Sequence, residues 1–250
     1  MKILVLAAGY GTRLYPLVTD TPKPLLKVSG KPLIDYILDH VQELPGLNEV
    51  LVVTNNKFYL DFQAWAKGKR EQGFPVKVSV INDGTMTPED RLGSVGDIHF
   101  ALEKHPFQDD LLVVGGDNLF DFNLAEYLDF ARKNSPAVSI GVYDIGDISK
   151  ANKFGVVNLA GDGKVDLFEE KPPQPKSSLI AMCFYHFPRE SLGLIGKYMS
   201  KSGKADNAGH YIQWLVKENA VYGFKFRGRW YDIGSIEAYQ EAQKAFSKEK

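Results

Sequence analysis

The sequence predicts an α/β fold with a doubly wound, mostly parallel, Rossmann-like sheet that carries β-rich insertions in its later part. Three observations predict it. Apolar runs alternate with helical patterns in the first half, hairpin patterns replace them after Asp144, and no repeat or low-complexity linker separates the halves. With 250 residues, 44% of them hydrophobic and 24% charged, the chain is long enough to bury a core without disulfide or metal support.

The first half of the sequence alternates strands and helices. Strands are expected at 3–6, 50–54, 76–81, 111–114 and 137–142. The runs at 3–6 and 111–114 are continuously apolar, which is typical of strands covered on both faces. Helical spacing lies between them, at 33–41, 58–67, 98–102 and 124–131. Pro32 suits the first turn of a helix, and Pro45-Gly46 ends that helix. A polar, Pro-rich loop is expected at 9–31.

The second half is richer in strands. A glycine-containing turn at 160–163 separates two β-patterned segments, 154–159 and 165–168, and therefore predicts a hairpin. Further strands are expected at 179–187 and 221–226, and helices at 191–199, at 211–218 and from Ser235 onward. In a mostly parallel sheet of this kind, ligands bind at the carboxyl ends of the strands.

Composition and charge exclude several classes of protein. Lys and Arg number 30 against 31 Asp and Glu, so the chain has no global basic field for nucleic acid or an anionic membrane. Its single cysteine, Cys183, excludes an internal disulfide and a cysteine-based zinc site. The apolar run at 3–8 is too short for a signal peptide, and no run approaches the ~18–20 residues of a membrane span. We therefore expect a cytoplasmic protein.

The segment that follows the first strand has the composition of a phosphate-binding turn. It reads Leu6-Ala7-Ala8-Gly9-Tyr10-Gly11-Thr12-Arg13-Leu14. Small residues let backbone N–H groups approach phosphate oxygens, and Arg13 adds a fixed positive fork. A Gly-x-Gly turn alone is more often an ordinary tight turn with a surface arginine. Here, however, Pro22-Lys23-Pro24-Leu25-Leu26 and Gly30-Lys31-Pro32-Leu33-Ile34 follow at close spacing.

With these three segments the chain resembles the sugar-1-phosphate nucleotidylyltransferases, and most of all the glucose-1-phosphate thymidylyl- and uridylyltransferases. The resemblance implies a Mg²⁺-dependent enzyme that joins a nucleoside triphosphate to a sugar-1-phosphate and releases pyrophosphate. It implies that Arg13 and Lys23 are catalytic and bind phosphates. It assigns nucleotide contacts to Leu6, Ala7, Ala8, Gly9, Gly11 and Thr12. Positive charge and positioning suit this reaction, because two polyanions must meet.

Two aspartates are candidate metal ligands. Asp117 follows a buried strand in Gly115-Gly116-Asp117-Asn118, and Asp232 lies in Trp230-Tyr231-Asp232-Ile233-Gly234. Carboxylate oxygens suit Mg²⁺, which takes few protein carboxylates. Their spacing does not show that the two meet, and Asp117 alone is more typical of a helix cap or turn residue. The resemblance implies that both bind the metal.

The resemblance also assigns a sugar-phosphate site. Lys153-Phe154-Gly155-Val156-Val157 and Phe168-Glu169-Glu170-Lys171-Pro172 match family segments. Gly155 would contact the sugar through its backbone, Glu170 would accept hydrogen bonds from hydroxyls, and Lys171 would bind the phosphate. A solvated charge run is the alternative for 169–171. The resemblance implies one nucleotidyltransferase domain: a nucleotide-binding half at about 1–145, a sugar-phosphate-binding half at about 146–234, and a C-terminal helix at 235–250.

The segment expected to contact the base departs from the family pattern. It reads Asn82-Asp83-Gly84-Thr85-Met86-Thr87-Pro88-Glu89-Asp90-Arg91-Leu92-Gly93, which is closer to sugar cytidylyltransferases, whereas Gly116-Asp117-Asn118 is the thymidylyl and uridylyl form. Asn82, Asp83 and Gly84 either contact the base or cap a loop, and Gly93 is expected beside the base.

Several alternatives stay open at this point. The preferred nucleotide is dTTP or UTP. The alternative is CTP, used by a cytidylyltransferase that acts on a sugar, polyol or choline phosphate. A non-catalytic nucleotide-sugar-binding module is the alternative from another class. The helix at 236–246 either closes the domain or mediates a homo-oligomer. No hexapeptide repeats follow it, so we expect no acetyltransferase part of the kind found in some relatives.

Overall fold

The computed structural model describes residues 1–202 and 207–247. The chain divides into two compact units. Unit 1 comprises Met1–Arg91, Val114–Asn123 and Gly228–Lys250, and unit 2 comprises Leu92–Val113 and Leu124–Arg227. The last three residues of the helix expected at 235–250 lie outside the described residues.

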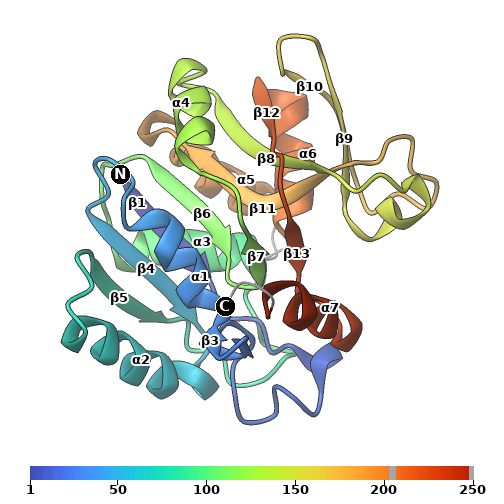
Figure 1. The fold of residues 1–250 in the computed structure, drawn as a ribbon. Coiled ribbons are helices and arrows are strands. Elements are labelled where there is room, and N and C mark those ends of the chain that lie inside the picture. Colours follow the sequence, from blue (N-terminus) through green and yellow to red (C-terminus); the bar gives the residue numbers. More distant parts are fainter. Residues whose placement is uncertain (203–206, 248–250) are drawn as a thin grey trace. The chain divides into compact units, whose positions relative to one another are not determined.

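Unit 1 is built on three parallel strands. They pair in the order β1–β4–β5, with Leu6 opposite Val53 and Val53 opposite Ile81. Every residue of β4 is buried, as its continuous apolar run predicts for a strand covered on both faces. The strands are β1 (Lys2–Leu6), β4 (Glu49–Thr54) and β5 (Lys77–Asn82), and the helices between them are α1 (Leu33–Val41) and α2 (Tyr59–Glu71) (Figure 1).

The segment expected as a polar loop at 9–31 contains short regular elements instead. Sequence periodicity could not show them, because each is only two or three residues long. They are the 3₁₀ turns η1 (Thr12–Leu14) and η2 (Lys23–Leu25) and the two-residue strands β2 (Lys27–Val28) and β3 (Lys31–Pro32). A further 3₁₀ turn, η3 (Asn56–Phe58), precedes α2.

The C-terminal segment of the chain completes unit 1. Strand β13 (Trp230–Asp232) pairs antiparallel with β7 (Asn118–Phe120). Helix α7 (Ile236–Phe246) then packs against β2 and β13, and the Phe246 ring meets those of Tyr36 and Tyr231 edge-on. Phe246 belongs to a buried apolar cluster with Leu14. The helix therefore helps to close unit 1, one of the two roles that the sequence leaves open.

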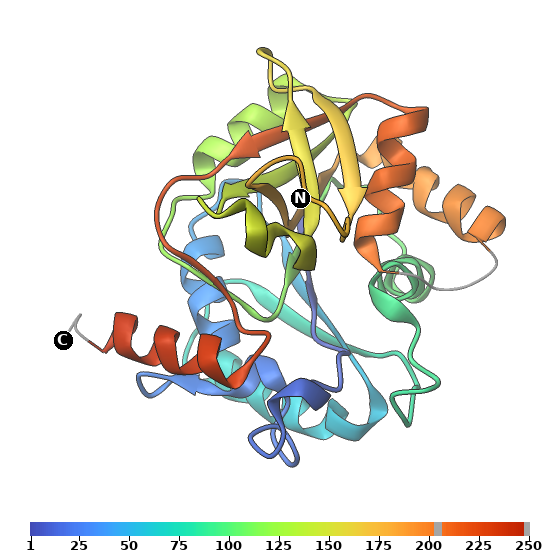
Figure 2. The same ribbon diagram turned by 90° about the vertical axis from the view of Figure 1, so that its right-hand side faces the viewer.

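Unit 2 holds the β-rich part of the fold. Strand β8 pairs antiparallel with β11 and parallel with β12, and β9 and β10 form the predicted hairpin. The strands are β8 (Val138–Asp144), β9 (Gly155–Leu159), β10 (Val165–Glu170), β11 (Leu179–Phe187) and β12 (Val221–Lys225). The helical segments are α3 (Gly93–Lys104), α4 (Ala125–Lys133), η4 (Ile148–Lys153), η5 (Arg189–Ser191), α5 (Gly193–Ser202) and α6 (Ala208–Glu218). Figure 2 shows the β9–β10 hairpin with α6 beside it.

The predicted fold class is confirmed, with parallel strands flanked by helices and a strand-rich later part. Strand β6 (Leu111–Gly115) is shared between the units, since its first three residues belong to unit 2 and its last two to unit 1. Within the part of the chain that the structure describes, no helix is long and apolar enough to cross a membrane.

Candidate functional site

The turn after β1 combines buried small residues with an exposed 3₁₀ turn. Ala7 and Ala8 are buried and Gly9 is exposed. Gly11 adopts a left-handed backbone, φ 63°, which glycine accepts without strain, and η1 begins directly after it. Thr12 and Arg13 are exposed on this 3₁₀ turn. The arginine is therefore free to meet an anion on the outer side of the turn.

Asn55, which sequence reasoning missed, fastens this turn to the next strand. Its side chain is fully buried at the carboxyl end of β4. The amide group donates to the Ala8 carbonyl at 3.0 Å, and the side-chain oxygen accepts from the Phe58 N–H at 3.1 Å. A second tie is the Ala7 N–H, which donates to the Val53 carbonyl at 2.8 Å. The turn is thus held by buried hydrogen bonds before any ligand arrives.

Lys23 and Asp117 form an ion pair. The Lys23 Nζ lies 2.6 Å from the Asp117 Oδ2, and the two side chains are 14% and 33% exposed. Lys23 begins η2, and Asp117 lies just beyond β6. The pair brings two predicted site residues together, and about a third of the Asp117 side chain stays exposed.

Gly116, a residue without an assigned role in the sequence, makes this meeting possible. Its N–H donates to the Leu6 carbonyl at 2.9 Å. A Cβ at this position would lie 2.8 Å from the Leu6 oxygen and 2.9 Å from the Pro24 Cγ, closer than real Cβ atoms approach. Only glycine lets the glycine turn, the Pro-Lys-Pro segment and the aspartate segment converge.

Asp232 joins Asp117 through the β13–β7 pair. Asp232 lies opposite Asn118, and the Ile233 N–H donates to the Asp117 carbonyl at 3.1 Å. The indole of Trp230 donates to the Asn118 side-chain oxygen at 2.7 Å and fixes the register. The two carboxylates that the resemblance pairs are therefore neighbours in unit 1.

The surrounding charges shift the pKa values of the two carboxyl groups in opposite directions. Burial opposes ionisation of Asp117, but the Lys23 ammonium, helped by Arg13, holds its pKa below the usual range. Burial and the negative charge of Asp117 raise the pKa of Asp232 to about 6. A cation bound between them would relieve that repulsion.

The donor set fits Mg²⁺. This ion is commonly held by one or two carboxylates, and phosphate and water complete its octahedral shell. Among the residues that the structure describes, no group of three or more histidine, cysteine, aspartate or glutamate side chains could hold a metal. Asp117 and Asp232 therefore suit a metal shared with a polyanionic ligand rather than a metal caged by protein alone.

The segment expected at the base caps a loop. Gly84 accepts a positive φ of 81°, and its N–H donates to the Asn82 side chain at 2.9 Å. The N–H and hydroxyl of Thr85 donate to the Asp83 carboxylate at 2.7 and 2.8 Å. The Asn82 amide also donates to the Asn56 side chain at 2.7 Å. Capping is compatible with base contact, which stays a prediction.

The predicted sugar-phosphate residues lie together in unit 2. Gly155 opposite Glu170 joins β9 to β10, and Lys171 follows directly. The Lys171 Nζ lies 3.3 Å from the Glu170 Oε1, and the lysine is 55% exposed against 8% for the glutamate. Glu170 is thus not part of a solvated charge run. Gly93 begins α3 in the same unit, with φ 75°.

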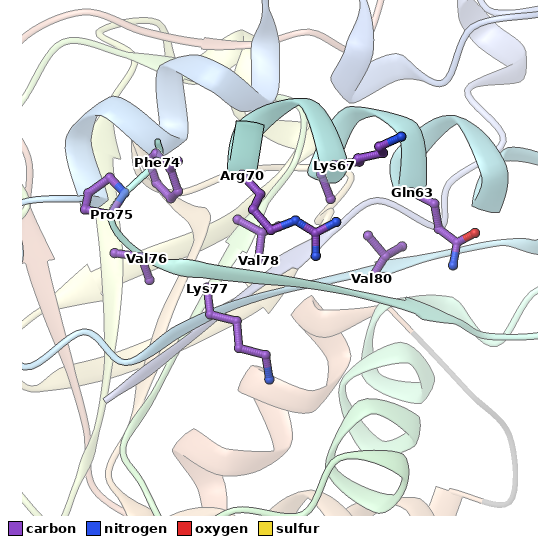
Figure 3. Close-up of a pocket in the computed structure, with 10 residues that line it drawn as sticks. Gln63, Lys67, Arg70, Phe74, Pro75, Val76, Lys77, Val78 and Val80 are labelled. Carbon is purple, nitrogen blue, oxygen red and sulfur yellow. The ribbon is translucent and has the colours of Figure 1, made fainter. Parts of the chain in front are cut away.

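A cavity of about 430 Å³ lies elsewhere in unit 1, between α2 and β5. Figure 3 shows Gln63, Lys67 and Arg70 projecting from α2 above Val78 and Val80 of β5. None of its lining residues is a predicted site residue. The cavity is therefore separate from the glycine turn and from the aspartate pair.

Comparisons with known proteins show which proteins the chain resembles. The chain is similar to the bifunctional protein GlmU of Methanocaldococcus jannaschii, at 30% identity over 247 residues, which cover 98% of this chain and 54% of GlmU. The chain thus spans about half the length of that curated relative.

Solved structures share the fold. A candidate glucose-1-phosphate thymidylyltransferase from Bacillus anthracis, crystallised with sucrose, superposes with a TM-score of 0.85 at 22% identity, over 100% of this chain and 96% of the other. A UDP-glucose pyrophosphorylase complexed with UDP-glucose gives 0.82 at 22% identity, over 100% and 99%.

The family follows from a match along the chain. A family model described as nucleotidyl transferase covers residues 2–249. This confirms the resemblance that the opening segments indicate. The protein is a member of the nucleotidyl transferase family.

Proposed function

We propose that the protein transfers a nucleotidyl group from a nucleoside triphosphate to a sugar-1-phosphate. An oxygen of the sugar phosphate attacks the α-phosphorus, the bond to the β-phosphate bridging oxygen breaks, and pyrophosphate leaves. Both reactants are polyanions, so the barrier is dominated by charge and positioning rather than by a side-chain nucleophile. The observation that carries the proposal is the convergence of the glycine turn, Lys23, Asp117 and Asp232 in unit 1.

In unit 1, backbone and cationic groups would bind phosphates, and carboxylates would bind the metal. The backbone of 6–12 would bind the nucleotide, and Arg13 would stabilise negative charge on the departing pyrophosphate. Lys23, now paired with Asp117, would turn to the substrate phosphates. Asp117 and Asp232 would hold Mg²⁺, which when bound supplies positive charge to phosphate oxygens.

In unit 2, Gly155, Glu170 and Lys171 would bind the sugar phosphate. A buried carboxylate accepts hydrogen bonds from hydroxyl donors, and an exposed lysine serves as a point charge for phosphate. On this proposal dTTP or UTP is the preferred nucleotide, as Gly116-Asp117-Asn118 indicates, and the segment at 85–92 favours CTP as the alternative.

A pyrophosphate-release panel tests the proposal. The protein is incubated with Mg²⁺ and each of ATP, GTP, CTP, UTP and dTTP, in combination with several sugar-1-phosphates. We expect one nucleotide and sugar phosphate to give turnover that EDTA abolishes and Mg²⁺ restores. If no combination releases pyrophosphate but the protein binds a nucleotide sugar, the result would instead support a non-catalytic binding module.

A further inference from the structure

The carboxylate of Glu170 lies in a slot walled by two glycines. On one side is Gly155, its partner in the β9–β10 register, where a Cβ would lie 3.2 Å from the Glu170 Oε2. On the other side is Gly209, in the first turn of α6, where a Cβ would overlap Oε2 and lie 2.9 Å from Oε1. Any larger residue at 209 would have to displace the carboxylate, the helix or both.

The wall that Gly209 forms is held in place. The Asn207 side chain caps α6 by accepting from the His210 N–H at 3.0 Å, and the Ala208 N–H donates to the Ser94 hydroxyl at 2.6 Å. One turn further along the helix, the Gln213 side chain accepts from the Glu170 N–H at 3.0 Å. The end of β10 and the first turns of α6 are therefore joined at Glu170, the residue whose carboxylate lies against Gly209.

The Glu170 carboxylate has positive electrostatic surroundings. The Glu170 carboxylate lies against the amino end of an 11-residue helix, where the helix dipole is positive. The Lys171 ammonium lies 3.3 Å from it. The Glu170 side chain is 8% exposed, and the Lys171 ammonium and the Gly209 backbone are close neighbours of its carboxylate. These neighbours set the direction in which the carboxylate accepts hydrogen bonds.

We propose that Gly209 is a positioning residue for the sugar-phosphate subsite, which it serves by fixing the direction of the Glu170 carboxylate. The ligand class is a sugar ring that presents hydroxyl donors to that carboxylate. This inference rests on the proposed function. It assigns a role to α6, an element outside every motif that the sequence analysis used.

The test is a Gly209→Ala variant with its KM measured separately for the two substrates. A methyl group at 209 must turn or push the Glu170 carboxylate. We expect the KM for the sugar-1-phosphate that the wild type uses best to rise about tenfold, the effect of misplacing one hydrogen bond to a charged group. The KM for the nucleoside triphosphate should stay within twofold, since the methyl group touches no predicted nucleotide residue.

Two further variants isolate the cause. Gly193→Ala is the matched control: Gly193 begins α5 in the same unit, its φ is not positive, and its Cβ would meet nothing within 4 Å. It should keep both KM values. Glu170→Asp shortens the acid by one methylene, so adding it to Gly209→Ala should cost less than the product of the two single effects.

The outcomes separate this inference from the function on which it rests. A wild-type protein that turns over no substrate of the panel removes the proposed function and the inference with it. An active wild type whose Gly209→Ala variant keeps its sugar-phosphate KM overturns the inference alone. A variant that melts at a lower temperature but keeps that KM also overturns it, because Gly209 would then serve packing only.

Discussion

At the scale of single residues, three charged side chains govern the candidate site in unit 1. Lys23 lies against Asp117 and offsets its charge, while Asp232 has no ammonium within salt-bridge range among the described residues. The raised pKa of Asp232 is the consequence of burial and of that imbalance. On the proposed function, a divalent cation would supply the missing positive charge, and a polyphosphate would supply the missing ligands.

Arg13→Ala should remove most of the turnover and leave the fold intact. Arg13 is exposed on η1, so its loss opens no cavity. Removing a group that stabilises charge on a leaving pyrophosphate should cost about a hundredfold or more in kcat. The measurement is pyrophosphate release under saturating substrate, with Arg70→Ala, another exposed arginine of unit 1, as the control. Wild-type rates in Arg13→Ala would remove its assigned role.

Asp117→Asn should shift the Mg²⁺ requirement. An amide oxygen is a weaker ligand than a carboxylate, and even outer-shell partners of a metal are worth about tenfold in affinity. We therefore expect the Mg²⁺ concentration for half-maximal rate to rise by at least about tenfold. An unchanged Mg²⁺ titration would place the metal elsewhere.

Mg²⁺ affinity should fall as the pH falls through about 6. The pKa of Asp232 is raised to about 6, so below that pH the carboxyl group becomes protonated and the proton competes with the metal. Calorimetric titration with Mg²⁺ at about pH 7 and about pH 5 measures the difference. In Asp117→Asn the repelling charge is gone, so the midpoint of this dependence should move to lower pH. Equal wild-type affinity at both pH values would contradict the assignment.

At the scale of elements, the site depends on a crowded junction. The end of β1, the turn η2 and the segment after β6 approach one another at Gly116. The Leu6 carbonyl and the Pro24 ring leave no room for a side chain at position 116. This steric constraint explains why a glycine directly precedes Asp117.

Gly116→Ala should destabilise the protein and reduce turnover together. The added methyl group would meet the Leu6 carbonyl and Pro24 at less than 3 Å, and overpacking of this kind costs about 1–3 kcal/mol. Urea unfolding gives the free energy. Gly68→Ala in α2 is the control, because its Cβ would meet nothing within 4 Å. It should be neutral or stabilise by up to ~1 kcal/mol. A Gly116→Ala protein as stable as the wild type would contradict the close packing.

Periodicity predicts the long elements and fails on the short ones. The apolar run of β4 and the two arms of the β9–β10 hairpin carry their own patterns, and both are confirmed. Strand β7 and its partner β13 have three residues each and lie far apart in the sequence, so no local pattern could pair Asp117 with Asp232. Gly116 and Gly209 matter through atoms that approach them from elsewhere, which a sequence does not display.

At the scale of the whole molecule, the fold tolerates far more change than the site would. Solved structures superpose with TM-scores of 0.80–0.85 at only 22% identity. A fold alone does not specify an activity, so the proposed function depends on the site residues. The net charge of −1 fits this view, because on the proposed function the attraction for polyanionic substrates would come from local cations and a metal rather than from a global field.

The stability of the protein should depend on pH through His186, a residue of β11 that is 1% exposed. Among the described residues its Nδ1 has no hydrogen-bond partner. Burial lowers the pKa of His186 to about 4, against about 6.5 in an unfolded chain. Above about pH 6.5 the imidazole is neutral in both states. Between about 6.5 and 4 only the unfolded chain takes up the proton, so the free energy of unfolding falls by about 3 kcal/mol and then levels off.

His186→Leu isolates this effect from that of the many carboxylates. Leucine is apolar and does not titrate, so the variant should lack the contribution of His186 while keeping every other pH dependence. Urea unfolding at about pH 7 and about pH 4.5 gives both free energies, and the wild type should lose roughly 2–3 kcal/mol more than the variant between them. Parallel losses in the two proteins would mean that His186 accepts its proton in the folded state and that its burial carries no such penalty.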